Sequence, residues 1–289
     1  MSAQHRRPLV VGIDDTTSGQ FAVRWAVEEA QRRGCPVRVI SAYGDTPPAT
    51  TPHVPDAGLP RASLRSRFDD AVAYAADRLG RDRVEGRLLR GRATDLLVDE
   101  SVGAGLVVVG SRQRSPLGAL VLGSVSGAVA AHADCSVVVV HPGPESLRPR
   151  VVVGVDRSDG ADVAMAAAFE AADNRGIALD VLHCWRPYVY VDQVPSDREL
   201  IAAERVKREH WLTEKVAVLS EKHPAVSVTT QLVEGGPGQE LADRSKTATL
   251  VVVGSPGHSA VSGLLLGSVS QHLLRHARCT VPVAREHGR

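Results

Sequence analysis

The chain has 289 residues and is 43% apolar, which is enough for about two ordinary domains that each bury a core. Its 34 Lys and Arg are balanced by 33 Asp and Glu, so it lacks the basic excess typical of proteins that bind nucleic acids or membrane surfaces. Aromatic residues make up only 3% of the chain, which argues against recognition of single strands by base stacking.

The first half of the chain alternates predicted strands and helices. An apolar run at 9–13 predicts the first strand, and a helical spacing of apolar residues from Ala22 follows and ends at Gly34, a residue typical of the position after a helix. A loop rich in Pro and Thr covers 44–60, and it is either a lid over a ligand or merely a mobile segment. The other predicted elements are a strand at 37–42, a helix over 63–79, a strand at 84–89, a helix at 94–101, a strand at 106–110, a helix at 124–132 and a strand at 136–140.

The second half of the chain repeats the first. Leu-Val-Val-Gly-Ile-Asp at 9–14 matches Val-Val-Val-Gly-Val-Asp at 151–156. Leu-Val-Val-Val-Gly-Ser occurs both at 106–111 and at 250–255. Such self-similarity indicates two copies of one structural unit.

The boundary between the copies lies near residue 148. The proline-rich segment at 141–150 is interpreted as a short, stiff linker, so we predict one domain over 1–147 and another over 148–289. The second copy has a longer helix, over about 197–221, preceded by a second candidate lid at 186–196.

The strands determine the fold class and the place of a ligand. Continuous runs of Val, Leu and Ile that alternate with helices predict an α/β fold with a parallel sheet covered on both faces. Each half is therefore predicted to be a doubly wound, Rossmann-like domain. In such sheets the ligand crevice lies at the carboxyl ends of the strands, where the strand order reverses.

A glycine motif follows the fourth strand of the second half. It reads Gly254-Ser-Pro-Gly257, then nine residues, then Gly267-Ser268 at the start of a helix. Glycines let backbone approach an anion closely, and the free N–H groups of a helix start suit a phosphate. The alternative is a tight turn in which Ser268 is an ordinary N-cap.

The first half has the same motif with one departure. It reads Gly110-Ser-Arg-Gln113, nine residues, then Gly123-Ser124. A side chain at Gln113 is strained if the position requires a positive φ, and it crowds the space that a phosphate would take. Arg112 and Arg114, in contrast, favour phosphate binding, because they offer charge-assisted hydrogen bonds to its oxygens.

These motifs, with the opening Val-Gly-Val-Asp and the closing Ala-Arg-Cys-Thr-Val-Pro-Val of the second half, resemble the universal stress protein family over both halves. The resemblance implies a five-stranded parallel sheet in each domain, ATP binding, and association through the last strands. In the second half it implies that Asp156 lies beside the ribose and adenine, with Gly154 and the Cys184 backbone nearby, and that the phosphates are held by Gly254, Gly257, Gly267, Ser268 and Val269. In the first half the matching candidate site comprises Gly12, Asp14, Ala42, Gly110, Gly123, Ser124 and Val125, with Arg112, Gln113 and Arg114.

Two other groups of residues are open to a structural interpretation. Asp14 and Asp156 each follow a strand directly, so they also fit the start of a helix at a βα turn. His272 and His276 have the i, i+4 spacing of zinc ligands, but no third ligand is apparent, so we expect no metal site.

The cysteines and the chain start bear on location. Cys35, Cys135, Cys184 and Cys279 form no C-x-x-C pair and are expected to be reduced thiols in the core. The first eight residues lack the apolar segment of a signal peptide, and no apolar run reaches the roughly 20 residues of a membrane span. We therefore expect a cytoplasmic protein without a membrane partner.

The sequence favours an ATP-binding regulatory or stress-response protein with no catalytic residue. A slow ATPase or an ATP-dependent transferase is the alternative, and a structural duplicate with an empty pocket is the third hypothesis. Whether Mg²⁺ accompanies ATP is left open. The final strands, at 136–140 and 280–284, are expected to pair within one chain, with formation of a homo-oligomer beyond that.

Overall fold

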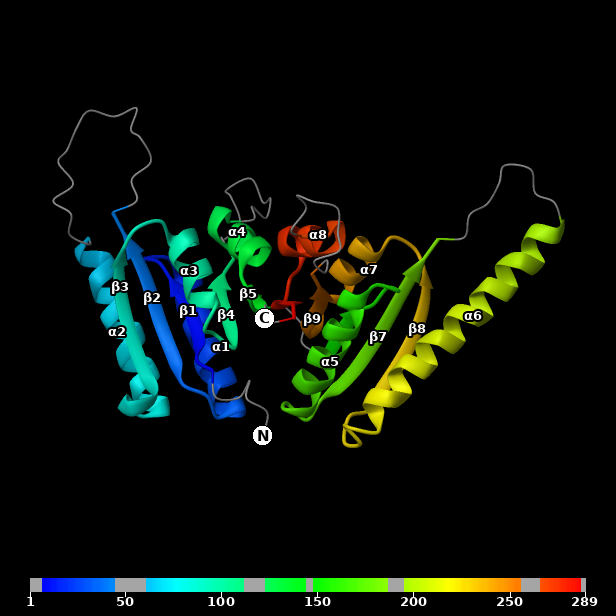
Figure 1. Ribbon diagram of the computed structural model, residues 1–289, viewed down its shortest axis with the longest axis horizontal. Helices are drawn as coiled ribbons and strands as arrows, with labels where there is room; N and C mark the ends of the chain where they lie inside the picture. Colours follow the sequence, from blue (N-terminus) through cyan, green and yellow to red (C-terminus); the bar gives the residue numbers. More distant parts are fainter. Residues whose placement is uncertain are drawn as a thin grey trace, which may run out of the picture. The chain divides into compact units, whose positions relative to one another are not determined.

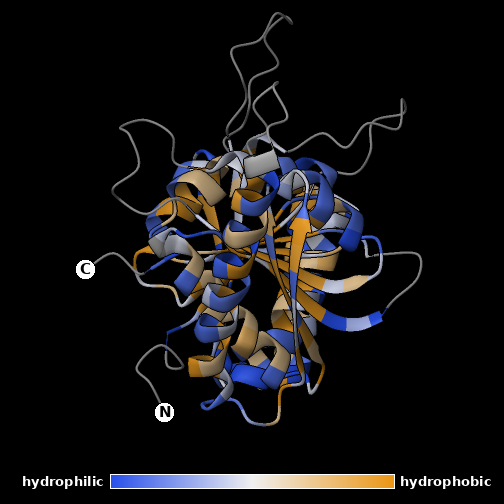
Figure 2. Ribbon diagram, turned by 90° about the vertical axis from the view of Figure 1, so that its right-hand side faces the viewer, coloured by the Kyte–Doolittle hydropathy of each residue, from blue (hydrophilic) through white to orange (hydrophobic). Residues whose placement is uncertain are grey.

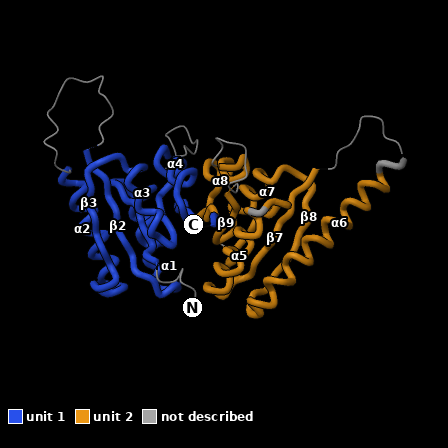
Figure 3. Tube along the Cα trace, in the orientation of Figure 1, with its two compact units in different colours: residues 1–142, 285–289 blue, residues 143–284 orange. Residues whose placement is uncertain are grey.

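The computed structural model describes residues 7–44, 61–111, 123–143, 148–186, 195–255 and 266–286. The chain divides into two compact units, one of Met1–Pro142 with Arg285–Arg289 and the other of Gly143–Ala284 (Figure 3). The segment expected to be a linker is partly regular, because residues 148–150 belong to the first strand of the second unit.

The first unit contains one parallel sheet. Its strands lie in the order β3-β2-β1-β4-β5, and each neighbouring pair runs in parallel. Its elements are β1 (Leu9–Ile13), α1 (Thr17–Arg33), β2 (Val37–Tyr43), α2 (Ala62–Leu79), the 3₁₀ turn η2 (Arg81–Arg83), β3 (Val84–Arg90), α3 (Ala93–Ser101), β4 (Leu106–Gly110), α4 (Ser124–His132) and β5 (Val137–Val140) (Figure 1).

The second unit repeats this topology. Its strands lie in the order β8-β7-β6-β9-β10, again with parallel neighbours. Its elements are β6 (Arg148–Gly154), α5 (Asp159–Asp173), β7 (Ala178–Trp185), α6 (Pro195–Ser220), β8 (Val228–Glu234), α7 (Pro237–Arg244), β9 (Ala248–Gly254), α8 (Ser268–His276) and β10 (Val281–Ala284). The expectation of two doubly wound α/β domains is confirmed.

The apolar strands form the middle layer of each unit. In the first unit α1 packs against α2, α3 packs against α4, and both α1 and α3 contact β1. Residues such as Val11, Val39 and Val108 are fully buried between these layers. Figure 2 shows the apolar colouring concentrated on the strands. Burial on both faces explains why the strands are continuous apolar runs rather than alternating ones.

The ends of the helices follow local sequence signals. Gly34 has φ +66°, and its N–H bonds to the carbonyls of Ala30 and Gln31, so the predicted end of α1 is confirmed. The predicted long helix is also confirmed as α6, with 26 residues against 18 in α2. Of the helices within the described ranges, none has the length and apolar character of a membrane span.

Candidate functional site

Each unit has a cavity at the carboxyl ends of its central strands. In the second unit the cavity has a volume of about 270 Å³, and in the first about 100 Å³. Both lie where the strand order reverses, between β1 and β4 in the first unit and between β6 and β9 in the second. This is the position at which doubly wound sheets bind ligands.

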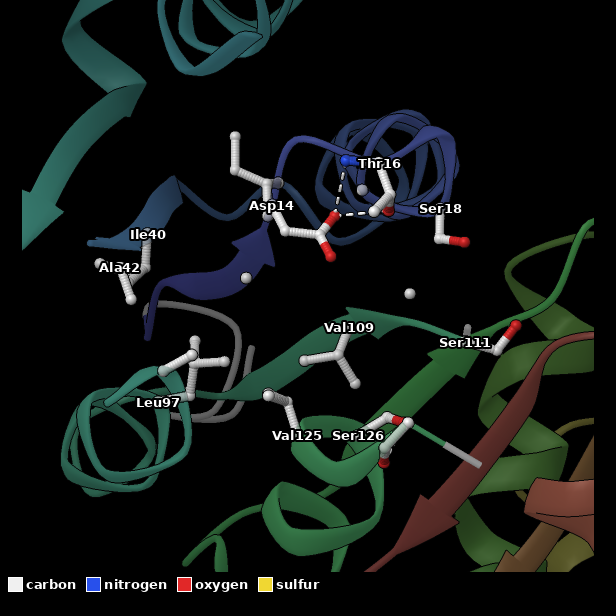
Figure 4. Close-up of a pocket in the computed structure, with 16 residues that line it drawn as sticks. Asp14, Thr16, Ser18, Ile40, Ala42, Leu97, Val109, Ser111, Val125 and Ser126 are labelled. Carbon is white, nitrogen blue, oxygen red and sulfur yellow. Dashed lines mark hydrogen bonds between the residues drawn. The ribbon is translucent and has the colours of Figure 1, made fainter. Parts of the chain in front are cut away.

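Most of the predicted site residues line these cavities. In the second unit they are Gly154, Asp156, Cys184, Gly254, Gly267, Ser268 and Val269. In the first unit they are Gly12, Asp14, Ala42, Gly110, Gly123 and Val125 (Figure 4). Ser124 is not among the lining residues of the first cavity. Arg112, Gln113, Arg114 and Gly257 lie outside the described residues.

The two aspartates make the same local hydrogen bonds. Asp14 Oδ1 accepts from the backbone N–H of Thr16 at 3.0 Å and from its hydroxyl at 2.5 Å. Asp156 Oδ1 accepts from the N–H of Ser158 at 3.0 Å and from its hydroxyl. Each aspartate therefore shapes its βα turn. The second carboxylate oxygen of Asp14 points toward the cavity in Figure 4, so this structural role leaves one oxygen for a ligand.

The strand-end glycines have a packing reason for lacking a side chain. A Cβ on Gly110 would lie 2.6 Å from the Ser18 carbonyl oxygen, and one on Gly254 would lie 2.6 Å from the Gly160 carbonyl oxygen. A Cβ on Gly12 would lie 2.7 Å from Leu97 Cδ1. The sheet thus needs glycine here to let helices approach, whatever a ligand requires.

The first turns of α4 and α8 begin at the cavities. Their N-cap residues are Gly123 and Gly267, which as glycines have no side chain that could accept a capping hydrogen bond from these turns. The alternative interpretation of Ser268 as the N-cap is wrong, because Ser268 is the first helical residue. The first N–H groups of a helix have no intrahelical acceptor, and they carry the positive end of the helix dipole. This arrangement suits an anion.

Serine and threonine side chains complete the cavities and were not selected from the sequence. Several occur at matching positions of both repeats: Thr16 and Ser158, Ser111 and Ser255, and Ser126 and Ser270. Ser270 Oγ donates to the Gly254 carbonyl at 2.8 Å, which ties the start of α8 to the end of β9. Recurrence in both copies is the signal that identifies these hydroxyls. Leu97 and Leu241 also line the cavities. The sequence alone does not distinguish a leucine that lines a cavity from a core leucine of the same helix.

The charges at the second cavity are few. Burial and, to a smaller extent, Glu240 raise the pKa of Cys184 to about 11 against the opposing effect of Arg244, so the thiol is neutral near pH 7. The rings of His272 and His276 lie against each other at a tilt of 38°, with centroids 4.4 Å apart. Over the described ranges there is no group of three or more His, Cys, Asp or Glu that could hold a metal ion.

Fold and site together define a tandem doubly wound α/β protein with an anion-suited crevice in each repeat. The chain belongs to the universal stress protein family, which matches residues 5–141 and 148–285. It is 36% identical over 293 residues to universal stress protein Rv2623 of Mycobacterium tuberculosis (strain ATCC 25618 / H37Rv), covering 96% of each chain. It is 33% identical over 295 residues to Rv2005c of the same strain, covering 96% of this chain and 97% of that protein.

A solved structure supports the two-unit architecture. The crystal structure of a universal stress protein from Archaeoglobus fulgidus DSM 4304 matches with a TM-score of 0.69 at 20% identity. The match covers 98% of this chain and 99% of that chain. At this level of identity the likeness establishes the shared fold.

Proposed function

We propose that the protein binds ATP in the crevices of its two units and acts as a regulatory protein of the stress response. The first turn of α8, which begins with the glycine N-cap Gly267 at the cavity beside Gly254, carries the proposal. Three negatively charged phosphates need several donors, and a free helix start supplies them without a counter-charge. Occupancy of the crevice would then bias the conformation or the assembly of the protein.

The lining residues suggest an orientation for the nucleotide in the second unit. The N–H groups of Ser268 and Val269 and the Ser268 hydroxyl face the phosphates. The unused oxygen of Asp156 accepts from a ribose hydroxyl, and the neutral wall at Leu182 and Cys184 takes the adenine. Gly257 would complete the phosphate cradle. A Mg²⁺ ion accompanying ATP would find oxygen donors in Asp156 and the serines.

The same lining residues argue against chemistry on a second substrate. Among those described for the second cavity, only Asp156 and Cys184 are titratable. Asp156 holds its turn through Oδ1 and, in the proposed orientation, its second oxygen accepts from the ribose. Cys184 is a neutral thiol. Neither is therefore a general base ready for proton transfer. A slow ATPase is the alternative function.

The identity of the nucleotide recovered from the protein distinguishes ATP retention from ATP hydrolysis. Purified protein is denatured, and the released small molecules are identified by mass spectrometry. Labelled ATP is then added to nucleotide-free protein in a single-turnover experiment. We expect ATP to be recovered intact after hours. Prompt formation of ADP would support the ATPase, and failure to retain any adenine nucleotide would contradict the proposal.

We also propose that copies of the chain associate and that the protein is cytoplasmic. Sedimentation with and without ATP measures the association directly. A species with the mass of one chain at micromolar concentration under both conditions would contradict it.

A further inference from the structure

A buried histidine connects the second cavity to the longest helix of its unit. His183 on β7 is 3% exposed. Its Nδ1 lies 2.9 Å from the carbonyl oxygen of Val155, and its Nε2 lies 3.0 Å from Nη1 of Arg208 on α6. A carbonyl only accepts hydrogen bonds and a guanidinium only donates them. The proton of His183 is therefore assigned to Nδ1, and Nε2 is the acceptor.

Aromatic rings fix α6 around this histidine. The Trp211 ring meets the His183 ring edge-on, with centroids 5.1 Å apart. Arg208 Cζ lies 5.3 Å from the centroid of Trp185, and Arg157 Cζ lies 5.9 Å from that of Trp211. These contacts join the middle of α6 to the ends of β6 and β7.

The histidine acts on the peptide that precedes the site aspartate. Val155 N–H donates to the Leu182 carbonyl at 2.9 Å, and the Val155 carbonyl accepts from His183. Both polar groups of this residue are thus held by β7. Val155 and Asp156 line the cavity, so a change at His183 is transmitted to the turn that carries Asp156.

The first unit has the same backbone contact without the histidine. Ser41 Oγ donates to the Ile13 carbonyl at 3.0 Å, and Ile13 and Ser41 match Val155 and His183 in the repeat. A serine hydroxyl does not titrate near neutral pH. Across the described residues of the first unit, Ser41 has no counterpart of the contact between His183 and Arg208.

We infer that His183 is a positioning residue that couples the second nucleotide site to α6 and makes binding at that site depend on pH. The inference rests on the function proposed above. A proton on Nε2 would place two N–H donors and two positive charges against each other, since Nε2 and Arg208 Nη1 are 3.0 Å apart. The contact with α6 is then lost, and because the ring stays bonded to the Val155 carbonyl, its displacement reaches the turn that carries Asp156.

The charged groups around His183 agree with a neutral ring. From α6 it faces Arg208, which is paired with Glu204 at 2.9 Å. From the turn after β6 it faces Asp156 and Arg157. Burial lowers the pKa of His183, and Arg208 and Arg157 lower it further, against the opposing effects of the Val155 bond and Asp156. The contact is therefore intact at neutral pH and is lost as the pH falls below the ordinary histidine value.

Replacement of His183 by the residue of the first repeat gives a matched test. His183→Ser offers a hydroxyl to the Val155 carbonyl, as Ser41 does for Ile13, but it neither titrates nor reaches Arg208. Hydrogen exchange of α6 amides in the full chain, without nucleotide, is compared at pH 7.5 and 5.5 after correction for intrinsic rates. We expect wild-type protection near Arg208 to fall several-fold at pH 5.5, and His183→Ser to be less protected at both pH values.

Nucleotide affinity provides the second measurement. Isothermal titration with ATP is carried out on protein whose first site is disabled by Gly123→Asp. The net loss of one hydrogen bond corresponds to roughly two- to tenfold in affinity, so ATP should bind about that much more weakly at pH 5.5 than at pH 7.5, beyond the change caused by protonation of ATP itself. In His183→Ser only the protonation of the terminal phosphate of ATP should contribute, so the ratio between the two pH values should be smaller than in the wild type by this factor.

Two further variants make the outcome decisive. Arg208→Met removes the partner of Nε2 and should lower α6 protection at both pH values, which covers the case that His183→Ser does not fold. His272→Ala, which introduces the residue found at Ala128 in the first repeat, should leave the pH dependence of α6 unchanged. Wild-type protection of α6 that is independent of pH overturns the inference. Absence of ATP binding at either pH, with a pH-dependent α6, contradicts the proposed function alone.

Discussion

At the scale of single residues, the packing role of the glycines that end β4 and β9 can be tested separately from a role in ligand binding. A methyl group on Gly254 would press on the Gly160 carbonyl oxygen at 2.6 Å, and backbone cannot rotate away as a side chain can. We predict that Gly254→Ala lowers the free energy of unfolding by about 1–3 kcal/mol, measured by urea denaturation of the full chain.

The control for this substitution is Gly103→Ala. A Cβ on Gly103 would have no heavy atom within 4 Å, so its effect should stay within about 0.5 kcal/mol. Unchanged stability of Gly254→Ala with weakened ATP binding would mean that the glycine serves the ligand alone.

At the scale of elements, substitutions at the N-cap of α8 distinguish the effect of helix capping from the effect of anion binding. Gly267 has φ −68° and ψ 156°, an extended conformation that any residue adopts. Asp is a preferred N-cap, so Gly267→Asp should keep or slightly raise stability, yet its carboxylate would repel a phosphate at the same donors. We predict an ATP affinity at this site roughly tenfold to a hundredfold lower, by calorimetry. Gly267→Asn caps the helix without adding a charge, so it should lose far less ATP affinity. Equal losses of ATP affinity in the two variants would contradict the charge argument.

The elements themselves were largely predictable, and the contacts between them were not. Continuous Val and Leu runs, and Gly34 directly after α1, are local signals. The observed strands and helix ends therefore agree with expectation to within a few residues. The glycine motif indicated strand ends that line the two cavities, although packing against Ser18 and Gly160 is a reason that spacing cannot reveal. The contact between His183 and Arg208 joins residues 25 apart. It depends on how α6 packs against β7, which a single sequence does not specify.

At the scale of the whole molecule, the two repeats carry cavities that are not equivalent. The second cavity is about 270 Å³ and the first about 100 Å³. The lining residues differ in both directions: Ile13, Thr16 and Ser18 correspond to the smaller Val155, Ser158 and Gly160, whereas Gly19 and Ala42 correspond to the larger Ala161 and Cys184. The two repeats also differ in their glycine motifs, since the first has Gln113 where the second has Gly257.

We therefore predict that the second site binds ATP about five-fold more tightly than the first, the equivalent of roughly 1 kcal/mol. Gly123→Asp weakens the first site and Gly267→Asp weakens the second, so calorimetry on each variant, fitted with two sites, reports the affinity of the intact site. Arg112 and Arg114 act in the opposite direction through charge-assisted bonds that salt weakens. The difference should accordingly widen from low to moderate salt. Equal affinities at moderate salt would show that the smaller first cavity and Gln113 are both accommodated by the nucleotide.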